Sequence, residues 1–384
     1  MSLDLEILEQ FLDTLDRFVR ERLIPREAQV ADDDAIPPSL VQEIRDMGLF
    51  GMSIPEEFGG LGLTMSEEVA AAFVLGQASP VFRSLVGTNN GIGSQGIIID
   101  GTPEQKSAYL PKLATGEMIA SFALTEPDAG SDAGSLKTSA RRDGDHYVLN
   151  GTKRFITNAP HAGVFTVFAR TDPSSKTSSG VSAFLVEAGT PGLSLGPIDK
   201  KMGQKGSHTC DVILDDCRVP ASAILGGQEG RGFKTAMKVL DRGRLHISAV
   251  CVGASERLIR DSLAYAMDRK QFGGPIAEKQ LIQAMLADSK AESYAARCMI
   301  EETARRKDAG KNVSTEAACC KMFASEMVGR VADRAVQIHG GAGYIADYGI
   351  ERFYRDVRLF RIYEGTTQIQ QIVIARNMIS DAAA

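Results

Sequence analysis

The spacing of hydrophobic residues changes twice along this chain of 384 residues. Up to about residue 120, apolar residues recur at helical intervals, and the loop Gly59-Gly60-Leu61-Gly62 interrupts them. Pro37-Pro38 and Thr102-Pro103-Glu104-Gln105 are typical helix starts, because proline fits the first turn and threonine accepts a hydrogen bond there. This region is therefore predicted to be helical. Its first apolar stripe consists of Leu5, Leu8, Phe11, Leu12, Leu15 and Val19.

Between about residues 121 and 235 the pattern is typical of short strands. Asn150-Gly151 separates two β-rich runs and predicts the two-residue turn of a hairpin. Further strands are expected at 164–169, 181–186 and 211–214. Because no helical segments alternate with these strands, we expect a small antiparallel sheet or barrel and not a parallel sheet.

From about residue 236 the helical spacing returns over longer stretches, which glycine-containing loops separate. This pattern predicts four long helices that pack as a bundle. Their apolar faces run from Ile247 to Met267, Leu281 to Cys298, Phe323 to Val336 and Ile369 to Met378. The chain is thus predicted to be a multidomain α+β protein with an N-terminal α-helical domain (1–120), a middle antiparallel β-domain (121–235) and a C-terminal four-helix bundle (236–384).

Composition and charge narrow the class of protein. With 43% hydrophobic and 24% charged residues, the chain is typical of a soluble globular protein. The formal net charge of −6 and the pI near 5.6, without a basic stripe, argue against a nucleic-acid-binding surface. No apolar run reaches the roughly 18 residues that a membrane span needs. The acidic, amphipathic N-terminus is unlike a secretory or import leader, so we expect a cytoplasmic bacterial protein.

The residues that commonly bind metals show no suitable spacing. The six cysteines contain no C-x-x-C pair, and the five histidines are scattered along the chain. We therefore expect no metal site, and free thiols suit a reducing compartment.

Glu364 is the first candidate for chemistry. It stands between an apolar run, which ends with Tyr363, and a small Gly-Thr-Thr step. A carboxylate that apolar neighbours separate from water is a stronger base, which suits a group that removes a proton from carbon. An isolated glutamate beside a glycine is also common at a helix start, so this stretch alone leaves both interpretations open.

Two segments of the predicted β-domain could hold a flat, polar ligand. The segment 121–132 combines hydroxyl side chains and small residues in a tight turn, which can present N–H and O–H groups to a ligand or cap itself. Phe155 and Thr157 are two residues apart and share one face of a strand. A ring could stack on Phe155 while Thr157 donates a hydrogen bond; the alternative is that Phe155 belongs to the core.

Two further motifs lie in the predicted bundle. The run Gln337-Ile338-His339-Gly340-Gly341-Ala342-Gly343 is glycine-rich like a dinucleotide-binding turn, but it follows a helix and not a strand. It is better explained as an interhelix loop that permits close approach of another backbone or of a ligand. Arg269-Lys270-Gln271-Phe272-Gly273 closes a long helix with a cation and an aromatic ring. This indicates either a complement to the helix dipole or a phosphate contact.

Taken together and in this order, these motifs closely resemble those of the acyl-CoA dehydrogenase family, and the resemblance covers essentially the whole chain. Each motif is weak alone, but five collinear motifs are specific. They are Leu124-Thr125-Glu126-Pro127 with Ala129-Gly130-Ser131-Asp132, Ile156-Thr157-Asn158, Asp268-Arg269-Lys270-Gln271-Phe272-Gly273, Gln337-Ile338-His339-Gly340-Gly341 and Tyr363-Glu364-Gly365-Thr366.

The resemblance implies FAD bound between domains and subunits, with Phe155 against the flavin ring and Thr157 near N5. Many relatives carry Trp where this chain has Phe155. The residues implied to contact FAD are Phe122, Leu124, Thr125, Ser131, Phe155, Thr157, Thr366 and Gln368, with Arg269, Phe272, Gln337 and Gly341 reaching the FAD of a neighbouring subunit. Those implied to line the acyl-CoA site are Ser131, Asp241, Arg244, Tyr363 and Gly365.

The resemblance also implies the reaction. Glu364 would remove the α-proton of an acyl-CoA thioester, and the β-hydrogen would pass as hydride to flavin N5, which gives the trans-2-enoyl thioester. Some branches place the base on the first bundle helix, but the matching residue here is Gly243, which cannot act as a base. Electrons would pass to an electron-transferring flavoprotein, and the assembly would be a homotetramer, a dimer of dimers.

Two other functions are compatible with the same motifs. An acyl-CoA oxidase would let O₂ reach the reduced flavin, although such enzymes often run longer at the C-terminus. A non-catalytic paralogue is disfavoured, because Glu364 is retained together with the flavin motifs. The acyl group stays open: the stretch 86–99 matches the floor of the acyl pocket, and its small and polar residues permit short, branched or unusual acyl groups.

Overall fold

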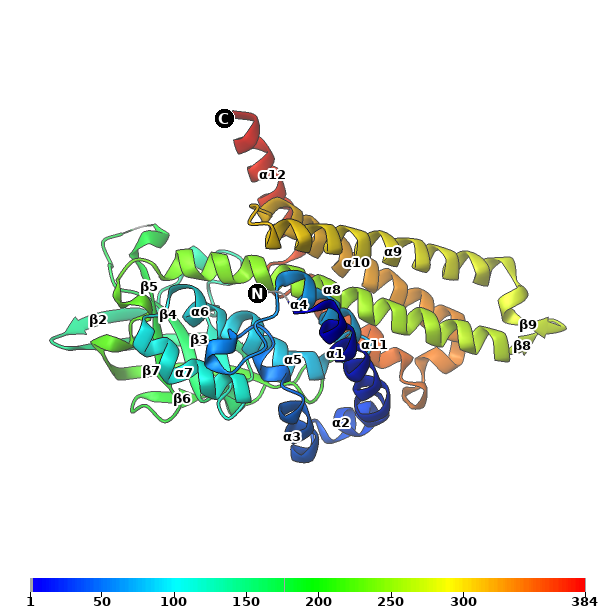
Figure 1. Ribbon diagram of the computed structural model, residues 1–384, viewed down its shortest axis with the longest axis horizontal. Coiled ribbons are helices and arrows are strands. Elements are labelled where there is room, and N and C mark those ends of the chain that lie inside the picture. The colour runs from blue at the N-terminus through cyan, green and yellow to red at the C-terminus, as the bar shows by residue number, and fades with distance from the viewer. Residues whose placement is uncertain (1–2, 176, 384) are drawn as a thin grey trace.

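The computed structural model describes residues 3–175 and 177–383; the ends of the predicted outer domains, residues 1–2 and 384, lie outside the described residues. As predicted, helical regions precede and follow a region of strands. Figure 1 shows the sheet at one end of the molecule and the long C-terminal helices extending to the other end. None of the helices in the described ranges combines the length and the hydrophobicity that a membrane span requires.

Short helices build the N-terminal region. They are α1 (Leu5–Phe18), α2 (Glu27–Asp33), α3 (Pro38–Asp46), α4 (Met65–Leu75), α5 (Pro80–Thr88), α6 (Gln95–Asp100) and α7 (Pro103–Thr115). Their starts follow the sequence signals, since proline stands in the first turn of α3 and of α7. At α7, Thr102 and Gln105 each accept a hydrogen bond from the other's backbone N–H, which completes a capping box.

The middle region is a sheet of mixed strand direction. Its strands are β1 (Ala120–Ala123), β2 (Ser139–Asp143), β3 (His146–Thr157), β4 (Val164–Arg170), β5 (Val181–Glu187), β6 (Leu193–Leu195) and β7 (Thr209–Pro220). Within the described residues they form a 7-stranded sheet of order β1-β4-β2-β3-β7-β6, and β5 also pairs with β4. The predicted strands at 164–169, 181–186 and 211–214 are confirmed as β4, β5 and part of β7.

The antiparallel expectation holds for most of these pairs but not for all. β1 pairs with β4 in parallel over its whole length, and β2 makes one parallel contact with β4. The sequence pattern does not predict this parallel pairing, because β1 is only 4 residues long and follows closely after α7. A parallel neighbour normally reveals itself by a helical crossover between two strands, and here no crossover helix separates β1 from β4.

The predicted hairpin at Asn150-Gly151 is wrong. Both residues lie inside the continuous strand β3, and the pairing with β7 shifts register between Leu149 and Gly151. Gly151 has φ 150°, and a Cβ there would lie 2.5 Å from the hydroxyl oxygen of Thr138. The Asn-Gly step therefore marks a β-bulge in which glycine permits close approach of a neighbouring segment. The turn between β2 and β3 is at Gly144, which has φ 62°.

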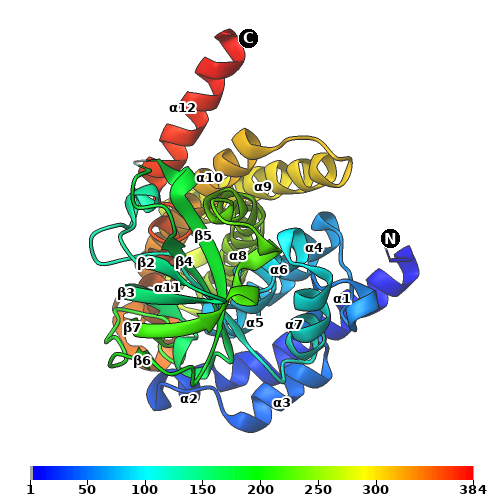
Figure 2. The same cartoon turned by 90° about the vertical axis from the view of Figure 1, so that its left-hand side faces the viewer.

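Long helices build the C-terminal region. The elements are α8 (Gly232–Asp268), β8 (Lys270–Gln271), β9 (Gly274–Pro275), α9 (Gln280–Asp308), α10 (Ser314–His339), α11 (Ile350–Val357) and α12 (Thr367–Ala383). Helices α8, α9 and α10 run side by side as a bundle (Figure 1). The fourth predicted helix, α12, starts against α10 and then projects away from the body (Figures 1 and 2). The short helix α11 was not expected.

The largest core joins the N-terminal and C-terminal helices. Buried residues of α4 pack against those of α8, α9, α10 and α11 in one apolar cluster. Where α4 meets α8, the two backbones touch: a Cβ on Gly253 would lie 2.3 Å from the carbonyl oxygen of Phe73, and a Cβ on Gly76 would lie 2.6 Å from that of Val250. This contact determines how deeply α8 sits in the molecule.

Gly253→Ala tests the close crossing of α4 and α8. The added methyl group has no space, so the helices must separate, and overpacking of this kind costs about 1–3 kcal/mol. We expect a lower melting temperature and a lower free energy of unfolding in denaturant titration. Gly91→Ala is the matched control, since a Cβ at Gly91 meets no atom within 4 Å. Equal stability of both variants would contradict the contact.

Candidate active site

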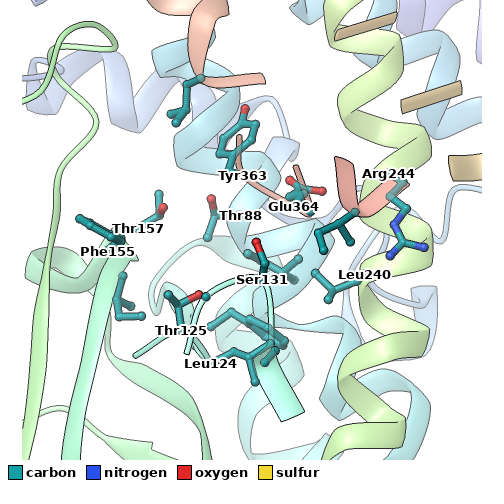
Figure 3. Close-up of a pocket in the computed structure, with 18 of the residues that line it drawn as sticks. Thr88, Leu124, Thr125, Ser131, Phe155, Thr157, Leu240, Arg244, Tyr363 and Glu364 are labelled. Atoms are coloured by element: carbon teal, nitrogen blue, oxygen red, sulfur yellow. The ribbon is translucent and has the colours of Figure 1, made fainter. Parts of the chain in front are cut away.

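A cavity of about 680 Å³ lies where the sheet, α5 and the C-terminal helices meet. In Figure 3, Phe155 and Thr157 from β3 lie on one side, and Leu240 and Arg244 from α8 lie on the other, with Glu364 between them. The cavity therefore collects residues that are far apart in the sequence. The predicted site residues that line it are Phe122, Leu124, Thr125, Ser131, Phe155, Thr157, Arg244, Tyr363, Glu364 and Gly365.

Glu364 is buried in the wall of this cavity, with its side chain 8% exposed. One carboxylate oxygen, Oε1, lies 3.3 Å from the guanidinium Nη2 of Arg83 in α5. The other oxygen, Oε2, is buried and has no hydrogen-bond partner among the described residues. The apolar surroundings that the sequence indicated are thus accompanied by a buried cation. One oxygen of this carboxylate is therefore paired with a cation, and the other is shielded from water without a hydrogen-bond partner.

The backbone that carries this carboxylate is held in an unfavourable conformation. Glu364 has φ 54° and Gly365 has φ 88°, both in the left-handed region, which is costly for glutamate. The fully buried Lys321 of α10 donates from Nζ to the Gly365 carbonyl at 2.6 Å. Gln370 of α12 donates to the carbonyls of Glu364 and Gly365 at 3.1 and 3.0 Å. These bonds offset the strain, and burial lowers the pKa of Lys321 to about 8.

Helix α8 makes room for the carboxylate. A Cβ on Gly243 would lie 2.5 Å from Glu364 Oε2, closer than any contact allows. Only glycine permits the backbone of α8 to approach the carboxylate in this way. Gly243, which cannot act as a base itself, is therefore the residue against which the Glu364 carboxylate packs.

The opposite side of the cavity fits a flat ring with polar edges. Phe155 has φ 60° and is 60% exposed, and the register shift between Lys153 and Ile156 turns it out of the regular strand. A large exposed aromatic ring beside the hydroxyl-bearing residues Thr125 and Thr157 is a surface that a flavin ring can cover. The donor set and the space therefore fit the implied cofactor.

A buried ion pair fixes the loop that carries Thr125 and Ser131. Lys153 Nζ lies 2.7 Å from Glu126 Oε1 and donates to the Leu124 carbonyl at 3.2 Å. Burial lowers the pKa of Lys153 to about 8, although the carboxylate of Glu126 acts in the opposite direction. Glu126 also accepts backbone hydrogen bonds from the segment that follows the loop. A satisfied buried network of this kind makes the loop rigid.

The remaining predicted site residues do not line the cavity. Asp241 is not among the lining residues, and its carboxylate pairs with Arg244 at 2.6 Å. Arg269 caps the end of α8, and Phe272 lies in the turn between β8 and β9, two strands that Figure 1 places at the far end of the helices from the sheet. Phe272 is 94% exposed there. Further residues outside the cavity lining are Gln337 and Gly341 at the end of α10, and Thr366 and Gln368 at the start of α12.

Sequence reasoning missed two charged residues that bear on the site, Arg83 and Lys321. Arg83 is a single charge within the apolar stretch 81–86, and Lys321 follows two cysteines within α10. A lone cation inside an apolar helical stretch is the signal that could have identified both, since a buried charge needs a partner.

The fold and the cavity define a class of protein. It is an enzyme in which a β-sheet domain lies between two helical domains along the chain, and a buried carboxylate borders a cavity that fits a flat ring. Family models described as the N-terminal, middle and C-terminal domains of acyl-CoA dehydrogenase match residues 6–117, 121–217 and 230–379. The chain belongs to the acyl-CoA dehydrogenase family, and it is a flavin-dependent oxidoreductase whose cofactor is FAD.

Individual relatives match along the whole chain. The acryloyl-CoA reductase (NADH) of Anaerotignum propionicum is 44% identical over 382 residues, which are 99% of this chain and 96% of that protein. The solved butyryl-CoA dehydrogenase of Megasphaera elsdenii is 35% identical, with a TM-score of 0.94 and coverage of 99% and 100%. A chain in a structure described as an electron transferring flavoprotein of Acidaminococcus fermentans is 38% identical, with a TM-score of 0.94 and coverage of 98% and 99%.

Gly243→Ala tests the contact between α8 and the carboxylate. The added methyl group would displace the Glu364 side chain, and a small misplacement of a reacting group costs on the order of 10²-fold in rate. We expect that loss in kcat/KM for acyl-CoA-dependent flavin reduction, with FAD content and melting temperature close to wild type. Unchanged kinetics would mean that Glu364 does not depend on this contact.

Lys321→Met tests the buried amine through the pH dependence of stability. The folded-state pKa of about 8 lies below the ordinary value of 10.5, so the folded protein binds fewer protons than the unfolded chain between these values. The stability of the wild type therefore rises with pH in this window. Relative to Lys321→Met, we expect the wild-type free energy of unfolding to gain up to roughly 3 kcal/mol from pH 7.5 to 10.5. A pH-independent difference in denaturant titrations would contradict the assignment.

Proposed function

We propose that this protein catalyses the α,β-dehydrogenation of an acyl-CoA thioester to the trans-2-enoyl-CoA, with Glu364 as the base that takes the α-proton. One observation carries the proposal: the Glu364 carboxylate is buried in the wall of the cavity and has an oxygen without a hydrogen-bond partner among the described residues. Bound FAD supplies the acceptor for the β-hydride.

The surroundings of Glu364 suit proton removal from carbon. The guanidinium of Arg83 lies 3.3 Å from one oxygen of the carboxylate and leaves the other oxygen open toward a substrate. Burial raises the pKa of the neighbouring Tyr363, so its hydroxyl stays protonated and does not compete as a base. General-base catalysis in such a site contributes about 10²–10⁴-fold to the rate. The buried walls also exclude water from the reacting carbon.

We propose binding roles for the other predicted residues from their positions around the cavity. Phe155 and Thr157 are proposed to contact the flavin ring, together with Phe122, Leu124, Thr125 and Ser131 from the facing wall. For the acyl-CoA we propose Ser131, Tyr363, Gly365 and Arg244. Arg244 is buried and bonded to Asp241 at 2.6 Å, so Asp241 would act by orienting it.

We also propose that the active enzyme is a homotetramer, a dimer of dimers, which passes electrons to an electron-transferring flavoprotein. The related chain in the Acidaminococcus fermentans structure supports this acceptor. The exposed Phe272 supports contact with a second subunit, because an aromatic ring that is 94% exposed gains by being covered. Arg269, Gln337 and Gly341 would reach the neighbour's FAD with it, and Thr366 and Gln368 would approach the cofactor beside the base.

Glu364→Gln tests the proposed base. Glutamine keeps the size of the side chain but cannot accept the proton, so turnover of an acyl-CoA should fall by about 10²–10⁴-fold or more. FAD content and the binding of the acyl-CoA, followed by the change in the flavin spectrum, should persist. Glu301→Gln on the outer face of α9 is the control and should retain turnover. Near-normal activity of Glu364→Gln would place the base elsewhere.

A further inference from the structure

His246 is a buried titratable side chain that the proposed reaction does not use. It belongs to α8 and is 0% exposed. Its Nδ1 lies 2.9 Å from Oε1 of Glu68 in α4. Its other ring nitrogen, Nε2, has no hydrogen-bond partner in the described part of the chain. A buried polar atom without a partner is costly, so such a nitrogen is rare inside a folded protein and indicates a function.

Glu68 determines which ring nitrogen of His246 carries the hydrogen. Burial alone would raise the pKa of Glu68, but Arg242 and His246 lower it to about 2. The ionised carboxylate can only accept hydrogen bonds, so Nδ1 of His246 is the donor in their contact. In the neutral ring, Nε2 then carries a lone pair and can only accept.

A donor that matches this lone pair lies beside it. Arg83 of α5 is 3% exposed, and its Nε is buried without a hydrogen-bond partner among the described residues. Its Nη2 reaches Glu364 Oε1 at 3.3 Å, which is long for a guanidinium and a carboxylate. A Cβ on Gly87 would lie 2.7 Å from Arg83 Nε and 3.1 Å from His246 Nε2. The two nitrogens thus flank one α-carbon, and glycine places no side chain between them.

The other titratable neighbours of Arg83 are poorer acceptors. Burial raises the pKa of Tyr363 and of Cys251, so this hydroxyl and this thiol stay protonated and neutral. Lys321 donates to the Gly365 carbonyl and offers no acceptor. A ring nitrogen whose opposite N–H is bonded to a carboxylate is the stronger acceptor among these groups.

We propose that His246 is a positioning residue, which accepts the Nε–H of Arg83 once Glu364 has taken the substrate proton. This inference rests on the proposed function. Before the transfer the guanidinium contacts the Glu364 carboxylate, and within the described residues no hydrogen bond joins it to the imidazole. After the transfer the carboxyl group is neutral and a weaker acceptor. A small turn of the guanidinium toward His246 then gives it a new partner.

This exchange of partners stabilises the state after the proton transfer. A buried guanidinium that faces only a neutral carboxyl group is costly. His246 offers a lone pair backed by the Glu68 carboxylate, and hydrogen bonds in such a chain strengthen one another. Because the contact is stronger after the transfer than before it, it lowers the barrier and does not merely add binding energy. Only hydrogen bonds are exchanged: Glu364 takes the proton, and FAD accepts the hydride.

Two substitutions of His246 separate the roles of its ring nitrogens. Asparagine places an amide where Nδ1 lies and keeps a donor for Glu68, but it offers nothing at Nε2. Glutamine places an amide oxygen where Nε2 lies. His246→Asn should slow flavin reduction about 10-fold, the effect of one hydrogen bond to a charged group, without weakening the binding of the acyl-CoA. His246→Gln should recover most of the rate.

Stopped-flow reduction of the holoenzyme measures these rates, with the fastest substrate in a panel from butyryl-CoA to octanoyl-CoA. The isotope effect with the α-deuterated thioester should be at least as large in His246→Asn as in wild type, because the lost contact acts while the α-proton moves. His146→Asn is the matched control. Its ring pairs with Asp145 at the surface, so it should keep the wild-type rate and isotope effect.

The hydrogen position on the ring can be measured without turnover. In protein with nitrogen-labelled histidine, solid-state NMR should show His246 with a hydrogen on Nδ1 and none on Nε2. A hydrogen on Nε2 would leave no lone pair for Arg83 and would overturn the proposal. This measurement is decisive even if His246→Asn does not fold, because substitutions of the other histidines assign the signals.

The kinetic outcomes distinguish this inference from the proposed function. An unchanged rate in His246→Asn, a smaller isotope effect, or an equal loss in His246→Gln would each show that His246 serves packing alone. In those cases wild type still reduces its flavin, and the dehydrogenase assignment stands. If no acyl-CoA reduces the wild-type flavin, the proposed function fails and this inference fails with it.

Discussion

The site depends on pairing one carboxylate with a cation inside the protein. A buried carboxylate is stable only when a cation or hydrogen-bond donors compensate for the lost water. Arg83 from the N-terminal region provides the cation for Glu364, which lies near the other end of the chain, 281 residues away. The central helix α5 must therefore lie against the segment that precedes α12, and the rest of the architecture serves to keep them together.

Close backbone contacts fix that arrangement. α8 approaches α4 at Gly253 and Gly76, and it approaches the carboxylate at Gly243. Since interiors are packed as densely as crystals, a shift at one of these contacts is transmitted to the next. Lys321 then holds the left-handed turn that aims Glu364. The strain is thus local, while the contacts that stabilise it come from three distant parts of the chain.

The periodic parts of the fold could be read from the sequence, because amphipathic spacing and end signals are local. The capped helix start at Thr102 and the strands β4 and β5 follow from such signals. The Asn150-Gly151 turn failed for a physical reason: glycine serves a β-bulge and a close approach as well as it serves a hairpin. The parallel pairing of β1 with β4 could not be foreseen, since it depends on where a strand of 4 residues docks.

The amino-acid sequence alone was sufficient to predict the order of helical and strand regions, the family motifs and Glu364 as the candidate base. Those features depend on short stretches of the chain, so the spacing and the types of neighbouring residues are sufficient to predict them. The three-dimensional packing was needed to see that Arg83 faces Glu364, that Lys321 supports the turn and that Gly243 lets α8 approach the carboxylate. The pairing of buried charges depends on distances in space. When two residues are far apart in the sequence, nothing in the residues around either one identifies its partner.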